Sequence, residues 1–167
     1  MTRAIAMLAC LLIAATVLPK TVSAEEGASG LLLPRFVSLR ADQVNLRTGP
    51  GVRYPIDWVF ERKGLPVQII AEFEAWRQVR DSEGATGWVH RSMLSGKRTV
   101  MINGDVDRMF REPKSKALVT GYVEAGIIGD VLECEGAWCR IGIANPHVEG
   151  WIERRGLWGV MPGEEVR

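Results

Sequence analysis

Histidine, cysteine and long apolar segments are scarce in this chain. Of its 167 residues, only two are histidine and three are cysteine. Two histidines leave little material for metal coordination or acid–base catalysis. Basic and acidic residues nearly balance, at 21 and 20, which argues against a nucleic-acid-binding protein because that class carries a strong basic excess. After residue 24, no stretch sustains the apolar spacing of an amphipathic helix.

The composition that remains is typical of short strands joined by turns. The chain contains 18 glycines and 8 prolines, and 47% of its residues are hydrophobic. Charged residues make up 25%, an ordinary globular proportion that excludes collagen-like and fully disordered classes. We therefore expect a folded β protein.

The one long apolar run lies near the N-terminus, from Ile5 to Leu18. It is shorter than the roughly 20 residues that a membrane-spanning helix needs. Val22-Ser23-Ala24 then supplies the small residues of a cleavage site. We predict a signal peptide over residues 1–24, cleaved after Ala24, and a periplasmic or secreted protein with no stable membrane insertion after cleavage. An uncleaved anchor and lipid attachment at Cys10 are the alternatives.

The rest of the chain contains one pattern twice. Each copy has an apolar run, a polar break, Ala-Trp, a second run and then Gly-Trp followed by a β-branched residue. Three pairs of segments match: Ile69–Val79 with Val131–Ile141, Gly87–Val89 with Gly150–Ile152, and Leu46–Gly49 with Phe110–Pro113. Their offset stays between 62 and 64 residues, which predicts two tandem domains.

Each unit has the size and pattern of a small all-β domain. Val67–Ile70 and Arg77–Arg80 predict the arms of a hairpin, and Trp88–His90 predicts a third strand. We expect five or six strands in each unit, closed into a small barrel. The predicted boundaries are an N-terminal tail at 25–34, a first domain at 35–98, a second domain at 99–160 and a C-terminal tail at 161–167. Both tails are expected to be loose.

These residues carry a family resemblance. Val44-Asn45-Leu46-Arg47-Thr48-Gly49-Pro50-Gly51 resembles the opening of a bacterial SH3-like domain, and Gly87-Trp88-Val89 resembles its closing strands. The second unit is similar through Gly150-Trp151-Ile152, but Phe110–Pro113 lacks the Gly-Pro-Gly turn, so a binding loop there should differ in shape. The resemblance covers roughly residues 35–160 and implies two tandem SH3-like β-barrels. Family members are mostly non-catalytic modules that bind cell-wall peptides or proteins, often fused to wall hydrolases.

The resemblance also implies a binding groove formed by an early loop and its aromatic neighbours. Here the loop runs from Arg47 to Trp58, and the candidate ligand-binding residues are Arg47, Arg53, Tyr54 and Trp58. The alternative is that Trp58 and the two residues after it form a core strand, which leaves only Tyr54 exposed. The expected partner is a cell-wall peptide or peptidoglycan, with an envelope protein as the alternative. We expect no cofactor and no nucleic acid.

Cys134 and Cys139 are the only cysteines after residue 24, and four residues that include a glycine lie between them. This spacing predicts a hairpin with Cys134 opposite Cys139 and Leu132 opposite Ile141. Opposed residues have Cβ atoms about 4.5–5.5 Å apart, close to disulfide range. An oxidising compartment favours the bond, so we predict a structural disulfide.

The first unit offers a comparison for this hairpin. Glu72 and Arg77 occupy the positions of the two cysteines, and we expect them to form a weak cross-strand ion pair. Two different links at one site favour a structural role for the cysteines over a redox or zinc site.

Catalytic patterns are not apparent. His90 precedes Ser92, and His147 lies in an Asn-Pro-His turn, but neither histidine has an orienting acid beside it. The acidic residues are scattered, and a small barrel offers no deep cleft in which to raise the pKa of a catalytic acid. We expect a non-catalytic protein, with a wall hydrolase as the distant alternative.

Overall fold

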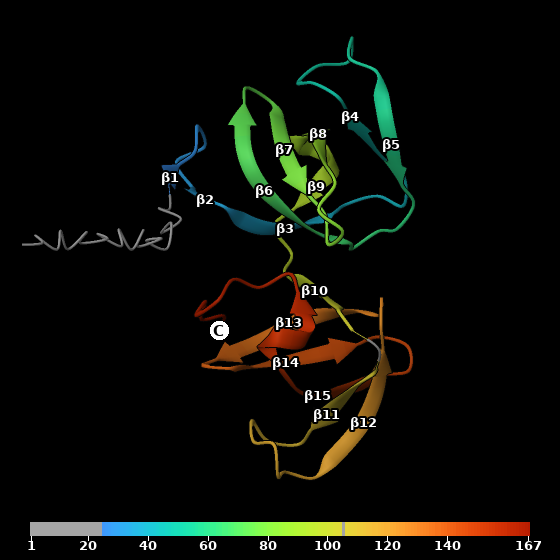
Figure 1. Ribbon diagram of the computed structural model, residues 1–167, viewed down its shortest axis with the longest axis vertical. Helices are drawn as coiled ribbons and strands as arrows, with labels where there is room; N and C mark the ends of the chain where they lie inside the picture. Colours follow the sequence, from blue (N-terminus) through green and yellow to red (C-terminus); the bar gives the residue numbers. More distant parts are fainter. Residues whose placement is uncertain (1–24, 105) are drawn as a thin grey trace, which may run out of the picture.

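The computed structural model describes residues 25–104 and 106–167 as two small β domains that follow one another along the longest axis (Figure 1). The N-terminal part contains strands β1 (Glu25–Glu26), β2 (Leu32–Leu33), β3 (Arg35–Leu39), β4 (Val44–Arg47), β5 (Ile56–Phe60), β6 (Pro66–Phe73), β7 (Trp76–Arg80), β8 (Thr86–His90) and β9 (Leu94–Ser95). The C-terminal part contains β10 (Thr99–Ile102), β11 (Val106–Phe110), β12 (Val119–Glu124), β13 (Ile128–Glu135), β14 (Trp138–Ile143), β15 (Val148–Glu153) and β16 (Leu157–Trp158). One 3-10 turn precedes the last strand of each domain: η1 (Arg91–Met93) and η2 (Arg154–Gly156).

The two domains share one topology. The first sheet has the order β5-β4-β8-β7-β6-β3-β9, and the second has the order β12-β11-β15-β14-β13-β10-β16. The two orders agree strand by strand, so the sequence repeat is a repeat of the fold, and the prediction of two small all-β domains is confirmed. Each sheet has seven strands instead of five or six, because β9 and β16 add short partners to β3 and β10.

The sheets correct one part of the sequence alignment. Arg47 and Phe110 hold the same position, because each lies opposite the tryptophan of its Gly-Trp motif. The sequence pattern had paired Arg47 with Arg111. A β-bulge follows the buried Leu46 in one domain and the buried Met109 in the other. The buried residues Leu46 and Met109 are therefore equivalent in the two folds, whereas the sequence alignment had matched the two arginines.

Each domain buries its own apolar core, as alternating strands require. The first core consists mainly of Leu39, Val44, Leu46, Phe60, Val67, Ile69, Val79, Val89 and Leu94. The second core consists mainly of Val100, Ile102, Met109, Val123, Cys134, Cys139, Ile141, Ile143, Ile152, Leu157 and Val160.

The long hairpin of the second domain contains the predicted disulfide. Cys134 lies opposite Cys139, and their sulfur atoms are bonded at 2.03 Å. The loop between the strands contains only Gly136 and Ala137, because the residues on either side of them still pair with each other. The disulfide therefore closes the tip of the β13–β14 hairpin.

The predicted register beyond the disulfide is wrong by one residue. Val131, not Leu132, lies opposite Ile141. A bulge between Val131 and Glu133 places Leu132 outside the ladder, with 38% of its surface exposed. A bulge adds one residue to one strand, so strict alternation of side chains could not predict it.

The first domain links the same point of its hairpin with charges. Glu72 lies opposite Arg77, whose Nε is 3.0 Å from the carboxylate, and the predicted ion pair is confirmed. Arg35 adds a second contact of 2.5 Å, and Ser29 donates from its backbone N–H and its hydroxyl. The Glu72 side chain is only 1% exposed. Burial raises the pKa of this carboxyl, but hydrogen bonds from Arg35 and Ser29 outweigh burial and keep the pKa below its ordinary value.

The segments at residues 25–34 and 161–167, which were expected to be loose tails, are each held by hydrogen bonds to a domain. Ser29, in the loop between β1 and β2, binds the carboxylate of β6 described above. In the second segment, Val166 exchanges backbone hydrogen bonds with Cys134, and Arg154 donates to the carbonyls of Met161 and Glu164. The two segments thus cover equivalent positions on the two long hairpins.

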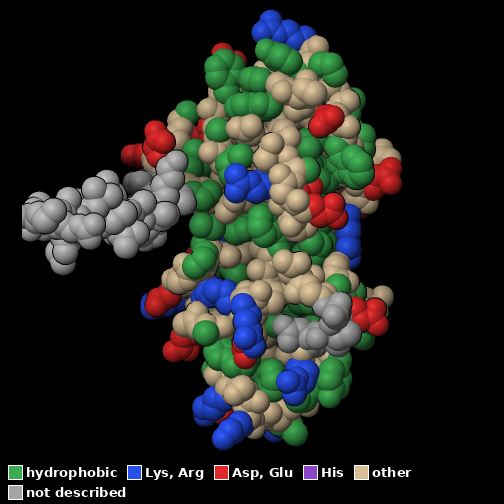
Figure 2. Space-filling view, in the orientation of Figure 1, with side chains coloured by type: hydrophobic (Ala, Val, Ile, Leu, Met, Phe, Trp, Pro, Cys, Tyr) green, Lys and Arg blue, Asp and Glu red, His purple; other side chains and the backbone are tan. Residues whose placement is uncertain are grey.

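The domains touch each other directly, and the space-filling view shows no gap between them on the face drawn (Figure 2). The Trp158 indole donates to the Pro66 carbonyl at 3.0 Å and meets the Phe36 ring edge-on, with 5.0 Å between centroids. The Thr99 hydroxyl donates to the Gly64 carbonyl at 2.7 Å. Together with the short linker, these contacts fix one domain on the other.

The predicted signal peptide lies outside the described residues. Within residues 25–104 and 106–167, no helix has the length and hydropathy needed to cross a membrane.

Candidate functional site

The loop between β4 and β5 is kept compact by its own side chains. Arg47 donates to the carbonyls of Val52 and Tyr54, at 3.2 and 2.8 Å. The Tyr54 ring lies against Gly49 so closely that a Cβ atom there would overlap it. The loop therefore needs glycine at position 49. Arg47, a predicted ligand-binding residue, is half-buried and positions the loop.

Arg53 is presented to solvent at the tip of this loop. Its guanidinium carbon lies 5.2 Å from the centroid of the Tyr54 ring, within cation–π range. The same guanidinium lies 3.4 Å from the tyrosine hydroxyl. The Tyr54 ring thus supports the exposed guanidinium of Arg53, so these two predicted residues contact each other.

A hollow of about 570 Å³ lies beside Arg53. It joins the tip of the loop to the β6–β7 turn and to the end of β8, and we call it the first-domain groove. Its lining residues are Pro50, Gly51, Val52, Arg53, Phe73, Glu74, Trp76 and His90. This volume falls within the usual range of ligand-binding clefts.

The groove combines aromatic surface with charges of both signs. Phe73 is 50% exposed although it is apolar. Trp76 meets His90 edge-on at 5.3 Å between ring centroids, and His90 Nδ1 lies 2.7 Å from the Ser92 hydroxyl. With Arg53 on one side and Glu74 on the other, the groove is suited to an extended ligand that carries both an anionic and a cationic group.

Of the four predicted residues, Arg53 alone lines the groove; Arg47 and Tyr54 are not part of its lining, and neither is Trp58. Trp58 is 61% exposed on β5, opposite Leu46, so the alternative that it belongs to the core is wrong. The sequence analysis did not identify four of the lining residues: Phe73, Glu74, Trp76 and His90. They are distant from the loop in the sequence, and only the folding of the sheet brings them next to it.

Glu74 has an unusual backbone conformation. Its φ is 47°, in the left-handed region that favours glycine. The second domain has Gly136 at this position, with φ 53°. Strained non-glycine residues of this kind cluster at functional sites. The repeat aligns Glu74 with Gly136, and this alignment was the sequence signal that could have indicated a left-handed backbone at Glu74.

Replacing Glu74 with glycine should therefore stabilise the fold by about 1 kcal/mol, because it removes the left-handed backbone penalty. Denaturant unfolding of the Glu74→Gly and Glu74→Ala variants measures the effect, since alanine keeps the penalty while it removes the carboxylate. A Glu74→Gly variant no more stable than Glu74→Ala would show that the backbone is unstrained.

The second domain has a hollow of about 170 Å³ that shares one position with this groove and does not reach the β13–β14 turn. Glu153 stands where the first domain has His90, and it forms an ion pair with Arg155 at 2.6 Å. The Glu153 carboxylate in this narrow hollow is therefore already paired with an arginine.

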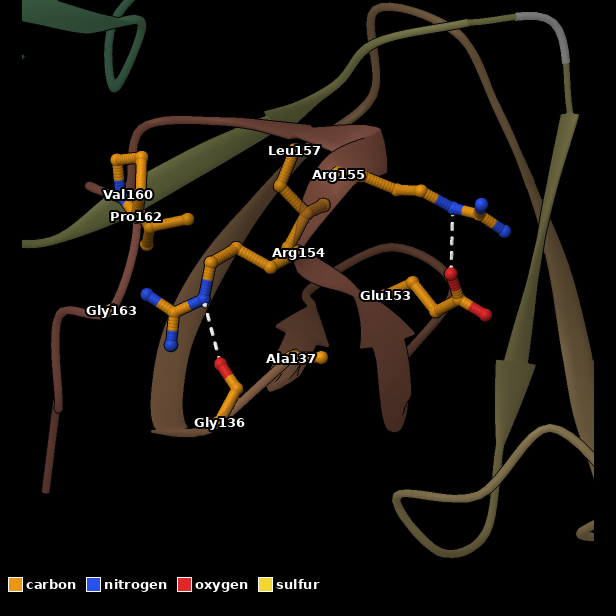
Figure 3. Close-up of a pocket in the computed structure, with 9 residues that line it drawn as sticks. All are labelled: Gly136, Ala137, Glu153, Arg154, Arg155, Leu157, Val160, Pro162 and Gly163. Carbon is orange, nitrogen blue, oxygen red and sulfur yellow. Dashed lines mark hydrogen bonds and ion pairs between the residues drawn. The ribbon is translucent and has the colours of Figure 1, made fainter.

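A further hollow of about 600 Å³ lies between the β13–β14 turn, η2 and the C-terminal segment (Figure 3). Its lining is mostly apolar and includes Leu157, Val160 and Pro162. Arg154 crosses it and donates from Nε to the Gly136 carbonyl at 3.1 Å. This guanidinium already binds three backbone carbonyls, so it secures the C-terminal segment and we assign the hollow no ligand.

Ionisable groups do not gather into a metal site in the described part of the chain. Among residues 25–104 and 106–167, no group of three or more His, Cys, Asp or Glu side chains has a metal-binding arrangement. His147 is exposed in the β14–β15 turn.

Comparison with known proteins agrees with the repeat. The family model of the bacterial SH3 domain matches the chain twice, at residues 40–96 and 105–159. A putative N-acetylmuramoyl-L-alanine amidase, YrvJ of Bacillus subtilis (strain 168), is 27% identical over 141 residues. The match covers 72% of this chain and only 27% of that relative.

Two solved structures show a weaker likeness. NlpC2 and NlpC1 from Trichomonas vaginalis are each 15% identical, with TM-scores of 0.35. The matches cover 75% and 80% of this chain and 48% of each of those chains. A likeness at this level defines no shared arrangement of the whole chain.

Proposed function

The chain belongs to the bacterial SH3 domain family, and from that premise we propose that it is a non-catalytic module that binds peptides of the bacterial cell wall. Two copies of the domain support a binding role. The similarity to a putative muramoyl-alanine amidase supports a role at the wall. The chain corresponds to only 27% of that relative, so the activity in its name does not transfer with the match.

The first-domain groove is the observation that carries this proposal. A wall peptide offers carboxylates, amino groups and small apolar side chains along an extended backbone. Arg53 and Glu74 can pair with the two kinds of charge, and Phe73 and Trp76 offer apolar surface between them. Exposed aromatic residues beside arginine are the usual centres of binding energy.

The contacts of His90 support the absence of catalysis. Its Nδ1 is 2.7 Å from the Ser92 hydroxyl, but the described residues include no carboxylate in hydrogen-bond contact with this ring. A serine–histidine pair without an orienting acid lacks the arrangement that activates a nucleophile. His90 also caps η1 by accepting from the Ser92 N–H, which gives it a structural role.

A protein that binds the cell wall must be exported from the cytoplasm. The predicted signal peptide at residues 1–24 and the wall-related relative both support export to the periplasm or beyond.

Co-sedimentation of residues 25–167 with protein-free peptidoglycan sacculi tests this function. We expect binding, and we expect Arg53→Ala and Phe73→Ala each to weaken it about tenfold, a loss of about 1.4 kcal/mol. Arg80→Ala is the matched control, because Arg80 is also exposed on the first domain but lies outside the groove. Arg47→Ala and Tyr54→Ala should weaken binding indirectly by loosening the loop.

Equal binding by all of these variants would contradict the groove as the site. An envelope-protein adaptor is the second candidate, favoured by the direct packing of the two domains. If the wild-type chain fails to sediment while envelope cross-linking yields one constant protein partner, the adaptor replaces wall binding.

A further inference from the structure

The junction of the two domains contains a hollow of about 430 Å³ that the proposed function does not use. Arg40, Arg62 and Lys63 line it from the first domain, and Lys97 lines it from the linker. Asp130 contributes from the second domain. None of these residues lines the first-domain groove, so the two hollows are separate sites.

Contacts between the two sides fix the shape of this hollow. Two of the hydrogen bonds that join the domains involve residues that line or adjoin it: Thr99 Oγ1 donates to the Gly64 carbonyl at 2.7 Å, and Arg62 Nη1 donates to the Gly126 carbonyl at 2.6 Å. Lys97 Nζ lies 2.8 Å from Asp130 Oδ1. The hollow is therefore a property of the packed pair and does not exist in either domain alone.

Positive charge is concentrated here. Four cationic side chains face one carboxylate, whereas the whole chain has a net charge of only +1. Asp130 already pairs with Lys97, and Arg62 uses one nitrogen on a carbonyl and has other donors left. For the side chains of Arg40 and Lys63, residues 25–104 and 106–167 provide no hydrogen-bond or ion-pair partner.

We propose that this interdomain basic hollow binds a small anionic group, a carboxylate or a phosphate, through Arg40, Arg62 and Lys63. Like charges gathered in a fixed cleft raise the local concentration of an opposite charge, and arginine matches the geometry of both anions. This site operates independently of the groove and does not require wall binding.

The test is a nuclear magnetic resonance titration of isotope-labelled residues 25–167 at low ionic strength. Inorganic phosphate is one probe and succinate is the other. We expect saturable amide shifts around residues 62–64 and 97–99, with a Kd of about 1 mM that rises as sodium chloride is added. Saturation by phosphate alone identifies a phosphate-bearing ligand, whereas saturation by both identifies a site that also accepts carboxylates.

Three variants separate this site from a generally basic surface. Arg40→Ala combined with Lys63→Ala should weaken binding at least about tenfold, and both side chains are exposed, so the fold should persist. Asp130→Asn should tighten binding several-fold, because it removes the opposing charge and releases Lys97. Arg80→Ala, which removes an exposed arginine outside both hollows, should leave anion binding unchanged. Shifts that do not saturate, or that persist in the Arg40 and Lys63 double variant, would mean adventitious association with surface charge and would overturn the proposal.

Discussion

Replacing Gly159 with alanine is expected to destabilise the second domain by about 4 kcal/mol or more. Gly159 has φ 128°, a conformation that side chains rarely adopt, and a Cβ atom there would overlap the backbone carbonyl of Thr99. The obstacle is main chain, which cannot rotate away. Gly159 directly follows β16, beside the first residues of β10, and Trp158, which bonds to the first domain, precedes it. Thermal or denaturant unfolding of the variant measures the loss.

Gly163→Ala is the matched control for this prediction. Gly163 also has a positive φ, 71°, but nothing lies within 4 Å of its Cβ position. Its replacement should cost only about 1 kcal/mol, the backbone penalty alone. If the two variants lose equal stability, the close approach to Thr99 does not constrain the fold.

The second large effect is expected at Glu72. Glu72→Gln should cost about 3 kcal/mol at neutral pH, because Arg35 and Arg77 would lose their buried counter-charge. The exposed pair Arg140–Glu149 provides the control, since its atoms are 2.7 Å apart but its side chains are 44% and 38% exposed. Glu149→Gln should cost less than about 1 kcal/mol.

The pH dependence of this effect has a definite sign. The native pKa of Glu72 is lowered, because hydrogen bonds from Arg35 and Ser29 outweigh the opposing effect of burial. Its contribution to stability is therefore fully present above the pKa of an unfolded glutamate, about 4.3, and is lost as pH falls through the native value. The difference in unfolding free energy between wild type and Glu72→Gln should be largest at pH 7 and shrink below about pH 4. A difference that stays constant into acid would show that the charge is not what stabilises the hairpin.

The sequence was sufficient for the architecture because the repeat constrains it. Two copies of the Gly-Trp motif at one offset indicated two domains, and both cross-strand links, Cys134–Cys139 and Glu72–Arg77, were predicted from hairpin pairing. The sequence analysis underestimated the strength of the Glu72–Arg77 link, which it expected to be a weak ion pair. Arg35 and Ser29 also reach this carboxylate, and both precede it by more than thirty residues.

The candidate site was less predictable, for physical reasons. Arg47 and Tyr54 were predicted as ligand-binding residues, but they chiefly shape the loop that presents Arg53. The opposite wall of the groove comes from the β6–β7 turn and from His90, which the sheet brings to the loop. The bulge in β13 shifted the predicted register of its hairpin, and the interdomain hollow depends on packing that no local pattern encodes.

The most direct measurement of the central claim is a titration of labelled residues 25–167 with a purified disaccharide-peptide released from sacculi, followed by amide chemical shifts. We expect saturable shifts confined to residues 50–53, to 73–76 and to His90, and their loss in Phe73→Ala. Shifts confined to the second domain or to the interdomain basic hollow, or no shifts at all, would contradict the first-domain groove as the site that binds wall peptides.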